Sequence, residues 1–272
     1  MQPITALSIA GSDSGGGAGI QADIRTFSAF GVHATTALTA ITAQNTLGVS
    51  KVQTLDPDLV EAQVRSVTSD FDVVATKTGM LAQASTVERV AALASEGLLP
   101  HLVVDPVLVS TSGHVLMEDG GVEAYRHALF PLAEVVTPNL REAAVLCGVD
   151  VRDVANLDDV AVLARTLLTL GPRFVLVKGG HFAHAPNVDR APDLLVSLDG
   201  LTVFDGPRVD TRNDHGTGCS LSSAIAAGLG LGRDVTDATR DAKSFVLAAL
   251  TGAVSWRLGE GRGPIDHLGW SE

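Results

Sequence analysis

The sequence predicts a three-layer α/β/α fold with a mostly parallel central sheet and helices on both of its faces. Short apolar segments alternate with amphipathic segments along almost the whole chain, which is the pattern of repeated β-α units. Several of the apolar segments are continuous runs of four or five residues, as expected for strands covered on both faces. No break in composition, repeat or low-complexity segment marks a boundary, so we expect a single domain over residues 1–272.

Eight apolar segments are predicted to be strands, and most of them are followed by a helical pattern. The last two differ, because they are short and flank Asp199-Gly200, a strong signal for a two-residue hairpin turn. In chain order the predicted strands are residues 4–10, 32–41, 73–77, 102–105, 134–137, 174–178, 194–198 and 201–204.

The predicted helices are marked by their starts, apolar stripes and stops. Asp56 precedes a proline, which indicates an N-cap followed by the first helical position. Ser85 and Glu88 have the spacing of a capping box. Leucines in residues 163–170 form a stripe that a Gly-Pro pair ends, and residues 238–249 form a last stripe rich in alanine.

Composition and charge exclude several classes of partner. The chain has 272 residues, with 19 Lys and Arg against 31 Asp and Glu, so its net charge is −12. This charge disfavours nucleic acid and anionic membranes as partners, and 4% aromatic residues offer few stacking platforms. Two cysteines build no disulfide framework, and neither a signal peptide nor a membrane-spanning apolar run is present in the sequence. We expect a cytoplasmic protein that acts on small molecules.

A glycine-rich segment, residues 11–23 (GSDSGGGAGIQAD), links the first predicted strand to a helix. It is not a dinucleotide fingerprint, because the third glycine of that motif would fall on Ile20, and no lysine of the chain follows a glycine as in a phosphate-binding Walker loop. The segment is either a tight strand-to-helix connection or a cradle over a small ligand. The Asp23 carboxylate either meets a ligand hydroxyl or supports the first helical turn.

A second glycine pair lies in residues 213–228 (NDHGTGCSLSSAIAAG), at the start of an alanine-rich helix. Gly216 and Gly218 leave backbone N–H groups bare there, a geometry that binds anions. Because a helix N-terminus lowers the pKa of a thiol, we expect Cys219 to act as a thiolate or proton acceptor near neutral pH. The alternative is an ordinary buried cysteine, and we expect that for Cys147 at the end of an apolar helix.

Two carboxylates follow predicted strands. Asn139 and Glu142, in TPNLREA, have capping-box spacing, and the same carboxylate could hold a water on a magnesium ion. Asp105, in VVDPV, ends a buried strand where ligands collect in open α/β sheets, although an Asp-Pro pair also forms turns.

Two lysines also end predicted strands. Lys178 precedes two glycines and could neutralise phosphate charge, but Lys77 has the same placement, and the residues alone do not separate them. His181 and His184 are three apart, yet no nearby cysteine or acidic residue completes a metal site with them. An anion-binding helix start, a proton acceptor, an acidic magnesium helper and a lysine together imply phosphoryl transfer.

The motifs resemble, in order, those of the hydroxymethylpyrimidine and phosphomethylpyrimidine kinases of thiamine biosynthesis, within the ribokinase-like superfamily. The matching segments span nearly the whole chain: AGSDSGGGAGIQAD, TAITAQNTLGV, KTGML, VVDPV, TPNLREA, VLVKGGH and HGTGCSLSSAIAAGL. HGTGC and NLREA alone indicate only the superfamily, whereas the whole set indicates this family. The resemblance implies a ribokinase-like fold and a kinase that uses ATP and Mg²⁺. Its substrates would be 4-amino-5-hydroxymethyl-2-methylpyrimidine and then the monophosphate, giving the diphosphate.

The resemblance also implies roles for individual residues. Cys219 would take the proton from the attacking hydroxyl, and the transferred phosphoryl group would lie in an anion hole made by Gly216, Thr217 and Gly218. The pyrimidine pocket would consist of Gln44, whose amide suits the aminopyrimidine ring, with Asp23, Ala18, Met80 and Val107. Magnesium would be served, directly or through water, by Asp105 and Glu142. ATP would lie near Asn139, Lys178 and Thr211.

One residue departs from the family pattern, and other functions stay open. Asp214 precedes HGTGC where the family more often has threonine, and its charge would repel a triphosphate unless magnesium or His215 offsets it. A pyridoxal, pyridoxine or dual-specificity kinase is the nearest alternative, because both rings carry a hydroxymethyl group. A non-catalytic pyrimidine-binding protein on the same fold and a sugar kinase are further alternatives. Family members commonly form homodimers, so we expect a homodimer.

Overall fold

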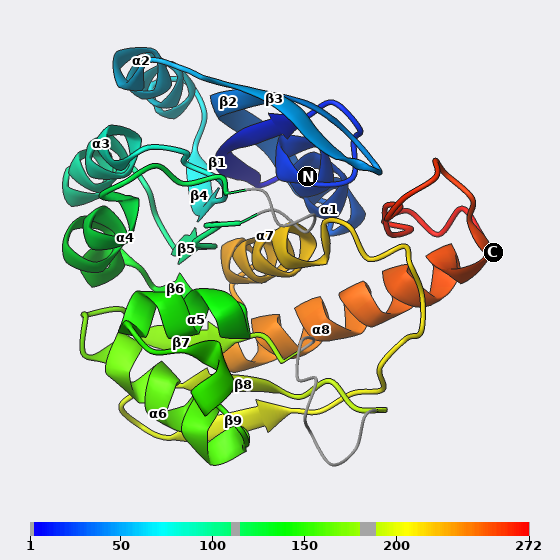
Figure 1. Ribbon diagram of the computed structural model, residues 1–272. Helices are drawn as coiled ribbons and strands as arrows, with labels where there is room; N and C mark the ends of the chain where they lie inside the picture. The colour runs from blue at the N-terminus through cyan, green and yellow to red at the C-terminus, as the bar shows by residue number, and fades with distance from the viewer. Residues whose placement is uncertain (1–2, 110–114, 180–188, 272) are drawn as a thin grey trace.

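The computed structural model describes residues 3–109, 115–179 and 189–271, which form a nine-stranded sheet covered by helices (Figure 1). The strand order is β3-β2-β1-β4-β5-β6-β7-β8-β9. The pairs between β2 and β7 are parallel, and the pairs at both edges are antiparallel. In chain order the strands are β1 (Thr5–Asp13), β2 (His33–Asn45), β3 (Gly48–Thr54), β4 (Val73–Thr78), β5 (Leu102–Val104), β6 (Val135–Val136), β7 (Phe174–Val177), β8 (Asp193–Val196) and β9 (Leu201–Phe204).

The sheet confirms the predicted fold and adds one strand that the sequence analysis missed. The predicted hairpin is formed by β8 and β9 with Gly200 in its turn, where the glycine has a φ of +154°. The missed strand, β3, pairs with β2 in an antiparallel hairpin at the edge of the sheet. Its residues are half-exposed or exposed, so its sequence, GVSKVQT, carries no apolar run to reveal it.

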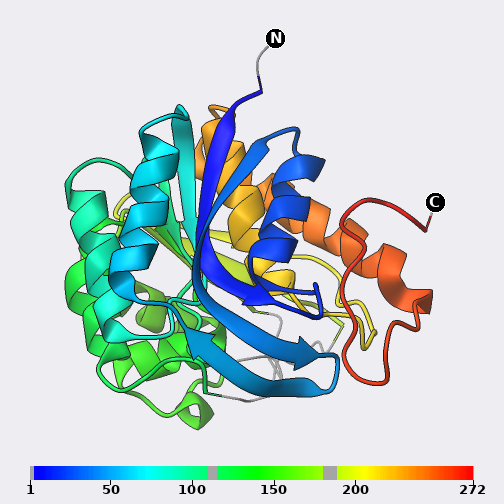
Figure 2. The ribbon, with the colours of Figure 1, turned by 90° about the horizontal axis from the view of Figure 1, so that it is seen from above.

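Helices lie on both faces of the sheet, and each face has its own apolar core. On one face, α1 (Gly19–Ala29), α7 (Thr217–Gly230) and α8 (Val235–Gly252) pack together, as Figure 2 shows for α1 and α7. The other face is covered by a larger set: α2 (Pro57–Thr68), α3 (Ala84–Ser95), α4 (Gly121–Ala124), α5 (Leu140–Cys147) and α6 (Leu157–Leu168). The continuous apolar strands between the two cores explain why the sequence showed runs rather than alternation.

The starts of the helices confirm two of the three predicted caps. The Asp56 side chain accepts a hydrogen bond from the Asp58 N–H at the start of α2. Asn139 and Glu142 form both hydrogen bonds of a capping box on α5. The predicted box at Ser85 is wrong, because α3 begins at Ala84, two residues before the start that this box implies, and its N-cap, Gln83, makes no side-chain cap.

The parallel strands place their carboxyl ends, and the loops that follow them, along a single edge of the sheet. The glycine-rich segment follows β1, Asp105 follows β5, the start of α5 follows β6, and Lys178 follows β7. The start of α7 reaches the same edge, so the predicted site residues converge there. His181 and His184 lie outside the described residues. Among the helices that the structure describes, none is both long and apolar enough to cross a membrane.

Candidate active site

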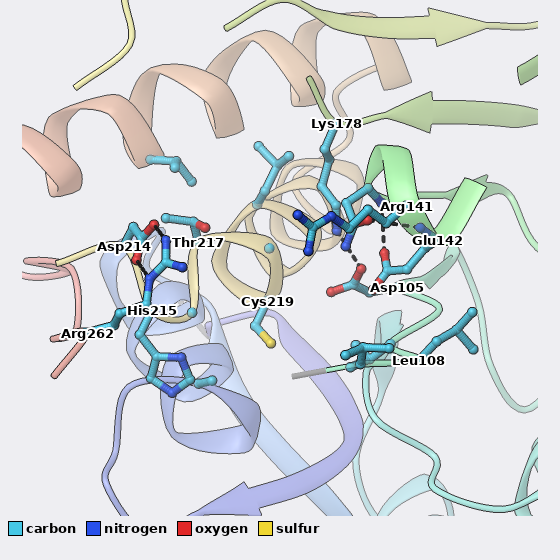
Figure 3. A pocket seen from close by; sticks show the side chains of 18 of the residues that line it. Asp105, Leu108, Arg141, Glu142, Lys178, Asp214, His215, Thr217, Cys219 and Arg262 are labelled. Carbon is cyan, nitrogen blue, oxygen red and sulfur yellow. Dashed lines mark hydrogen bonds and ion pairs between the residues drawn. The ribbon is translucent and has the colours of Figure 1, made fainter. Parts of the chain in front are cut away.

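A cavity of about 1070 Å³ opens at the carboxyl edge of the sheet (Figure 3). Its wall is formed by the loops after β1, β5 and β7, by the hairpin of β2 and β3, and by the first turns of α5 and α7. Every residue predicted for the site lines it except Asp23; the lining set is Ala18, Gln44, Met80, Asp105, Val107, Asn139, Glu142, Lys178, Thr211, Gly216, Thr217, Gly218 and Cys219.

The start of α7 requires glycine for two separate reasons. Gly216, the N-cap, has a φ of +88°, and a Cβ there would lie 1.9 Å from the carbonyl oxygen of Gly17. A Cβ on Gly218 would lie 3.2 Å from Lys178 Nζ, so that glycine lets the lysine approach the helix start closely. The bare N–H groups of this turn therefore face a cation across a short gap, which is an arrangement for holding an anion.

Asp105 and Lys178 form an ion pair at the centre of the cavity. Their Oδ1 and Nζ atoms are 2.7 Å apart, and the side chains are 2% and 13% exposed. Burial alone would lower the pKa of Lys178, but the charges of Asp105 and Glu142 outweigh it and raise that pKa, so the lysine stays protonated. A charged, partly accessible ammonium is therefore available to a phosphate.

Glu142 is both a cap and a buried acid. Its Oε2 accepts a 2.8 Å hydrogen bond from the Asn139 N–H, and only 5% of the residue is exposed. Burial raises the pKa of Glu142, Lys178 opposes the shift, and the nearby charge of Asp105 adds to it. Two carboxylates that repel each other in a cavity would both be stabilised by a cation placed near them.

Cys219 points its sulfur from the first turn of α7 into the cavity (Figure 3). Burial raises the pKa of this thiol to about 11; the charge of Lys77 opposes the shift, while Asp23 and Asp105 add to it. The predicted lowering of the pKa by the helix start is therefore wrong, because desolvation and two carboxylates outweigh the helix dipole. In the free protein, Cys219 is a thiol at neutral pH.

Asp23 and Lys77 form a second ion pair, and it is fully buried. Lys77 Nζ lies 2.9 Å from Asp23 Oδ2, with both side chains 0% exposed. The same carboxylate accepts hydrogen bonds from Ser8 and Ser223. The prediction that Asp23 contacts the pyrimidine is corrected by this geometry, because its carboxylate is enclosed by protein partners. This ion pair also distinguishes the roles of the two lysines. Lys77 is buried and structural, whereas Lys178 faces the cavity.

Asp13 organises the glycine-rich segment. Its carboxylate accepts hydrogen bonds from the backbone N–H groups of Gly15, Gly17 and Ala18, and it lies 2.9 Å from His215 Nε2. Burial pushes the pKa of Asp13 up, but the hydrogen bonds from His215 and Ala18 prevail, so this pKa is lowered. The segment is therefore a loop wrapped around a carboxylate, which brings Ala18 to the wall of the cavity.

The C-terminal segment closes the rim between the hairpin and α7. The Arg262 N–H donates to the Thr46 carbonyl over 3.0 Å, and the Gly263 carbonyl accepts from the His215 N–H over 3.0 Å. The Arg262 guanidinium forms an ion pair with Asp214, with Nε 2.8 Å from Oδ1. The expected repulsion between Asp214 and a triphosphate is thus offset by an arginine, and not by His215 as considered above.

The sequence analysis did not place Asp13, His215, Arg141 or Arg262 in the site. Asp13 and His215 each adjoin a glycine-rich motif, and a carboxylate ahead of several bare N–H groups is a signal that could have been used. Arg141 lines the cavity next to Lys178 from the first turn of α5, where a cation is disfavoured by the helix dipole (Figure 3). Arg262 gives no local signal, because its partner lies 48 residues away.

The comparisons with known proteins agree with this geometry. The sequence matches the family described as phosphomethylpyrimidine kinase over residues 13–266. It is 47% identical over 267 residues to the hydroxymethylpyrimidine/phosphomethylpyrimidine kinase of Rhizobium meliloti, covering 97% of this chain and 96% of the relative. The pyridoxal kinase of Bacillus subtilis, solved as an ADP complex, aligns with a TM-score of 0.86 at 37% identity, covering 98% of each chain. The phosphomethylpyrimidine kinase of Clostridium difficile aligns with a TM-score of 0.79 at 38% identity, covering 91% of this chain and 99% of that one. The chain belongs to the phosphomethylpyrimidine kinase family.

Proposed function

We propose that this protein transfers the γ-phosphoryl group of ATP to the hydroxymethyl group of 4-amino-5-hydroxymethyl-2-methylpyrimidine, and then phosphorylates the monophosphate to the diphosphate. The observation that carries the proposal is that the start of α7, the ion pair of Lys178 and Asp105, and Gln44 all line one cavity. The N–H groups at the start of α7 and Cys219 face Lys178 and Asp105 (Figure 3), and Gln44 lines the same cavity. Family membership points to the same reaction.

In the first step, the hydroxymethyl oxygen attacks the γ-phosphorus, the bond to the bridging oxygen of ADP breaks, and the hydroxyl proton goes to the Cys219 sulfur. The N–H groups of residues 216–219 would hold the oxygens of the phosphoryl group in flight, and Lys178 would offset its charge. Because the free thiol has a raised pKa, Cys219 has to release its own proton to solvent water before its sulfur accepts the hydroxyl proton.

The second step makes a different demand on the same groups. Its nucleophile is a phosphate oxygen, and a phosphate monoester has a second pKa of about 6, so it is already ionised at neutral pH. No base is needed, but an anion now attacks an anion, and cations near the start of α7 become more important. We therefore assign Cys219 to the first step and Lys178 to both.

The acidic residues fit a magnesium ion bound with ATP. Mg²⁺ prefers oxygen ligands and is often held by one or two carboxylates together with substrate phosphates and water. Asp105 and Glu142 supply such oxygens, and their mutual repulsion, which contributes to the raised pKa of Glu142, would be relieved by a divalent cation. Described residues offer no cluster of three or more acidic, His or Cys ligands, so the remaining ligands would come from phosphate and water. The ion would neutralise phosphate charge.

Pyridoxal is the second candidate substrate, because the structurally similar Bacillus subtilis protein is a pyridoxal kinase. Pyridoxal also carries a hydroxymethyl group on a small heteroaromatic ring, and one altered contact changes substrate preference by only about 1–3 kcal/mol.

The test is ADP release with Mg²⁺ and ATP, measured separately with hydroxymethylpyrimidine, its monophosphate and pyridoxal. We expect turnover of both pyrimidines and little turnover of pyridoxal. Turnover mainly of pyridoxal would overturn the substrate assignment and keep the chemistry. Pyrimidine binding without ADP release would favour the non-catalytic alternative.

A further inference from the structure

The side chain of Gln44 is held in place by residues that have no assigned role in the reaction. Its Nε2 atom lies 3.1 Å from His215 Nε2, and its Oε1 atom lies 3.2 Å from Thr42 Oγ1. Its backbone N–H donates to Ser14 Oγ over 2.8 Å, and the same hydroxyl donates back to the Gln44 carbonyl over 2.7 Å. Both the backbone and the amide of Gln44 are therefore fixed.

The proton on His215 Nε2 can be assigned from Asp13. The two atoms, His215 Nε2 and Asp13 Oδ2, are 2.9 Å apart, and the side chains are only 13% and 5% exposed. Asp13 is an ionised carboxylate that already accepts from three backbone N–H groups, so it offers only acceptors. Nε2 must carry the proton, whether the ring is neutral or charged.

This assignment fixes the orientation of the Gln44 amide. A protonated Nε2 on His215 cannot accept from an NH₂ group, so the amide oxygen of Gln44 must face the histidine. Thr42 agrees, because its hydroxyl has one proton and donates it to the Ser12 carbonyl over 2.9 Å. Thr42 Oγ1 then accepts from the Gln44 NH₂ group. With this rotation, the single Nε2 proton of His215 is shared between Asp13 Oδ2 at 2.9 Å and the Gln44 amide oxygen at the 3.1 Å position, as a three-centre hydrogen bond, and the Thr42 contact has one donor and one acceptor.

We propose that His215, oriented by Asp13, is a positioning residue that locks the Gln44 amide in one orientation and so determines the preference for an aminopyrimidine ring. The inference rests on the proposed function, because it assumes that Gln44 contacts the ring. A primary amide has two donor and two acceptor positions. His215 and Thr42 occupy one of each, which leaves one N–H and one oxygen lone pair for the substrate.

The remaining donor and acceptor match one of the two candidate rings. The aminopyrimidine presents a ring nitrogen next to an exocyclic amine, which is an acceptor beside a donor. When pyridoxal is superposed by its hydroxymethyl group, a hydroxyl-bearing carbon takes the place of the ring nitrogen and a formyl group takes the place of the amine. The formyl group has no proton to donate to the Gln44 oxygen, so pyridoxal cannot complete both bonds. An amide locked in one orientation preserves the difference in affinity between the two rings, whereas an amide free to rotate loses part of that difference.

The test uses substitutions at His215 in the full-length protein. His215→Leu removes the donor and keeps a side chain of moderate bulk, and His215→Gln places an amide N–H close to the position of Nε2. His127→Leu, an exposed histidine on another part of the surface, is the matched control. Each variant is measured by calorimetric titration with hydroxymethylpyrimidine and with ATP, and by kcat/KM for hydroxymethylpyrimidine and pyridoxal.

We expect His215→Leu to weaken pyrimidine binding by about fivefold to tenfold, the worth of a neutral hydrogen bond or two, with ATP binding nearly unchanged. His215→Gln should recover most of the loss, and His127→Leu should behave like the parent. In a Gln44→Ala background, His215→Leu should have little further effect on pyrimidine binding.

Three outcomes would overturn the inference while the proposed function stands: equal losses for pyrimidine and ATP, an unchanged ratio of kcat/KM for the two rings, or fully additive effects of the Gln44 and His215 substitutions. If the parent protein phosphorylates neither pyrimidine, the proposed function itself fails. The two failures are therefore distinguishable.

Discussion

Cys147 and Cys219 have similarly raised thiol pKa values, but we propose a chemical role for Cys219 alone. Burial raises the pKa of both thiols to about 11, Cys147 at the end of α5 and Cys219 at the start of α7. In the mechanism that we propose, the thiolate fraction of Cys219 would limit the rate of the first phosphorylation. We expect kcat/KM for hydroxymethylpyrimidine to rise with pH through the alkaline range, since the thiolate fraction rises toward a pKa near 11. A flat profile between pH 7 and 10, measured with saturating Mg²⁺ and ATP, would contradict this role.

Removal of the thiol should separate the two phosphorylations. Cys219→Ala should abolish most turnover of hydroxymethylpyrimidine, by a factor of about 10² or more, and keep most turnover of the monophosphate, which needs no base. Cys147→Ala is the control and should leave both rates unchanged. The rates are measured with each substrate alone. Equal losses in the two steps would show that Cys219 acts by shaping the cavity rather than as a base.

The buried pair of Lys77 and Asp23 should contribute to stability rather than to chemistry. Lys77→Met leaves the buried Asp23 carboxylate without its cation and with only the Ser8 and Ser223 hydroxyls as partners, so we expect the free energy of unfolding to fall by about 3–5 kcal/mol. Replacement of both partners, Lys77→Met with Asp23→Leu, should restore much of that loss. Urea denaturation of the parent and both variants provides the measurement. A single-variant loss below about 1 kcal/mol would contradict the estimate.

At the residue scale, the sequence predicts which residue types line the site, but it does not predict which side chains pair with one another. The cavity-lining role of Lys178 and Cys219 follows from their motifs, but the sequence gives Lys77 the same surroundings as Lys178. Their difference depends on which side chains lie next to each strand end, and Asp23 reaches Lys77 from 54 positions away. Such pairings depend on the packing of α1 against β1 and β2 and on the place of β4 beside β1 in the sheet, which local sequence does not encode.

At the scale of elements, Glu142 in α5 has two roles: its carboxylate caps the helix, and we assign the same carboxylate to magnesium. Glu142→Gln keeps a side-chain acceptor for the cap, so the melting temperature should change little. Activity should nevertheless fall strongly, because the variant lacks the charge that we assign to magnesium. The matched control is Asp159→Asn in the exposed capping box of α6, which should affect neither quantity strongly. Activity retained in Glu142→Gln would limit Glu142 to its capping role.

The elements that the sequence predicted well are those whose signals are local. A few consecutive residues are enough to recognise the apolar runs of β1, β4, β5 and β7 and the glycine pair at the start of α7. By contrast, β3 has a half-polar sequence, and it is a strand because it completes the hairpin with β2. The same hairpin carries Gln44, at a position where the register of the pair shifts. Gln44, to which we assign recognition of the ring, therefore lies at the end of β2 beyond the predicted strand of residues 32–41, where no apolar run marks the strand.

At the scale of the whole molecule, the expected homodimer stays a prediction. Several large apolar side chains are exposed on the described surface, among them Leu47 at 69% and Leu198 at 93%. We expect light scattering after size exclusion to give twice the chain mass of 28.1 kDa. A mass of one chain at micromolar concentration would contradict the expectation.

The rim formed by the C-terminal segment has a consequence for synthesis. Residues 258–266 supply the hydrogen bonds that join the hairpin turn at Thr46 to His215, although these two regions are made much earlier. On the ribosome, the strands and most helices emerge before this segment, so the cavity stays incomplete until residues 258–266 have left the exit tunnel. Premature termination or clipping ahead of residue 258 should therefore yield a chain with its sheet and an unfinished pocket.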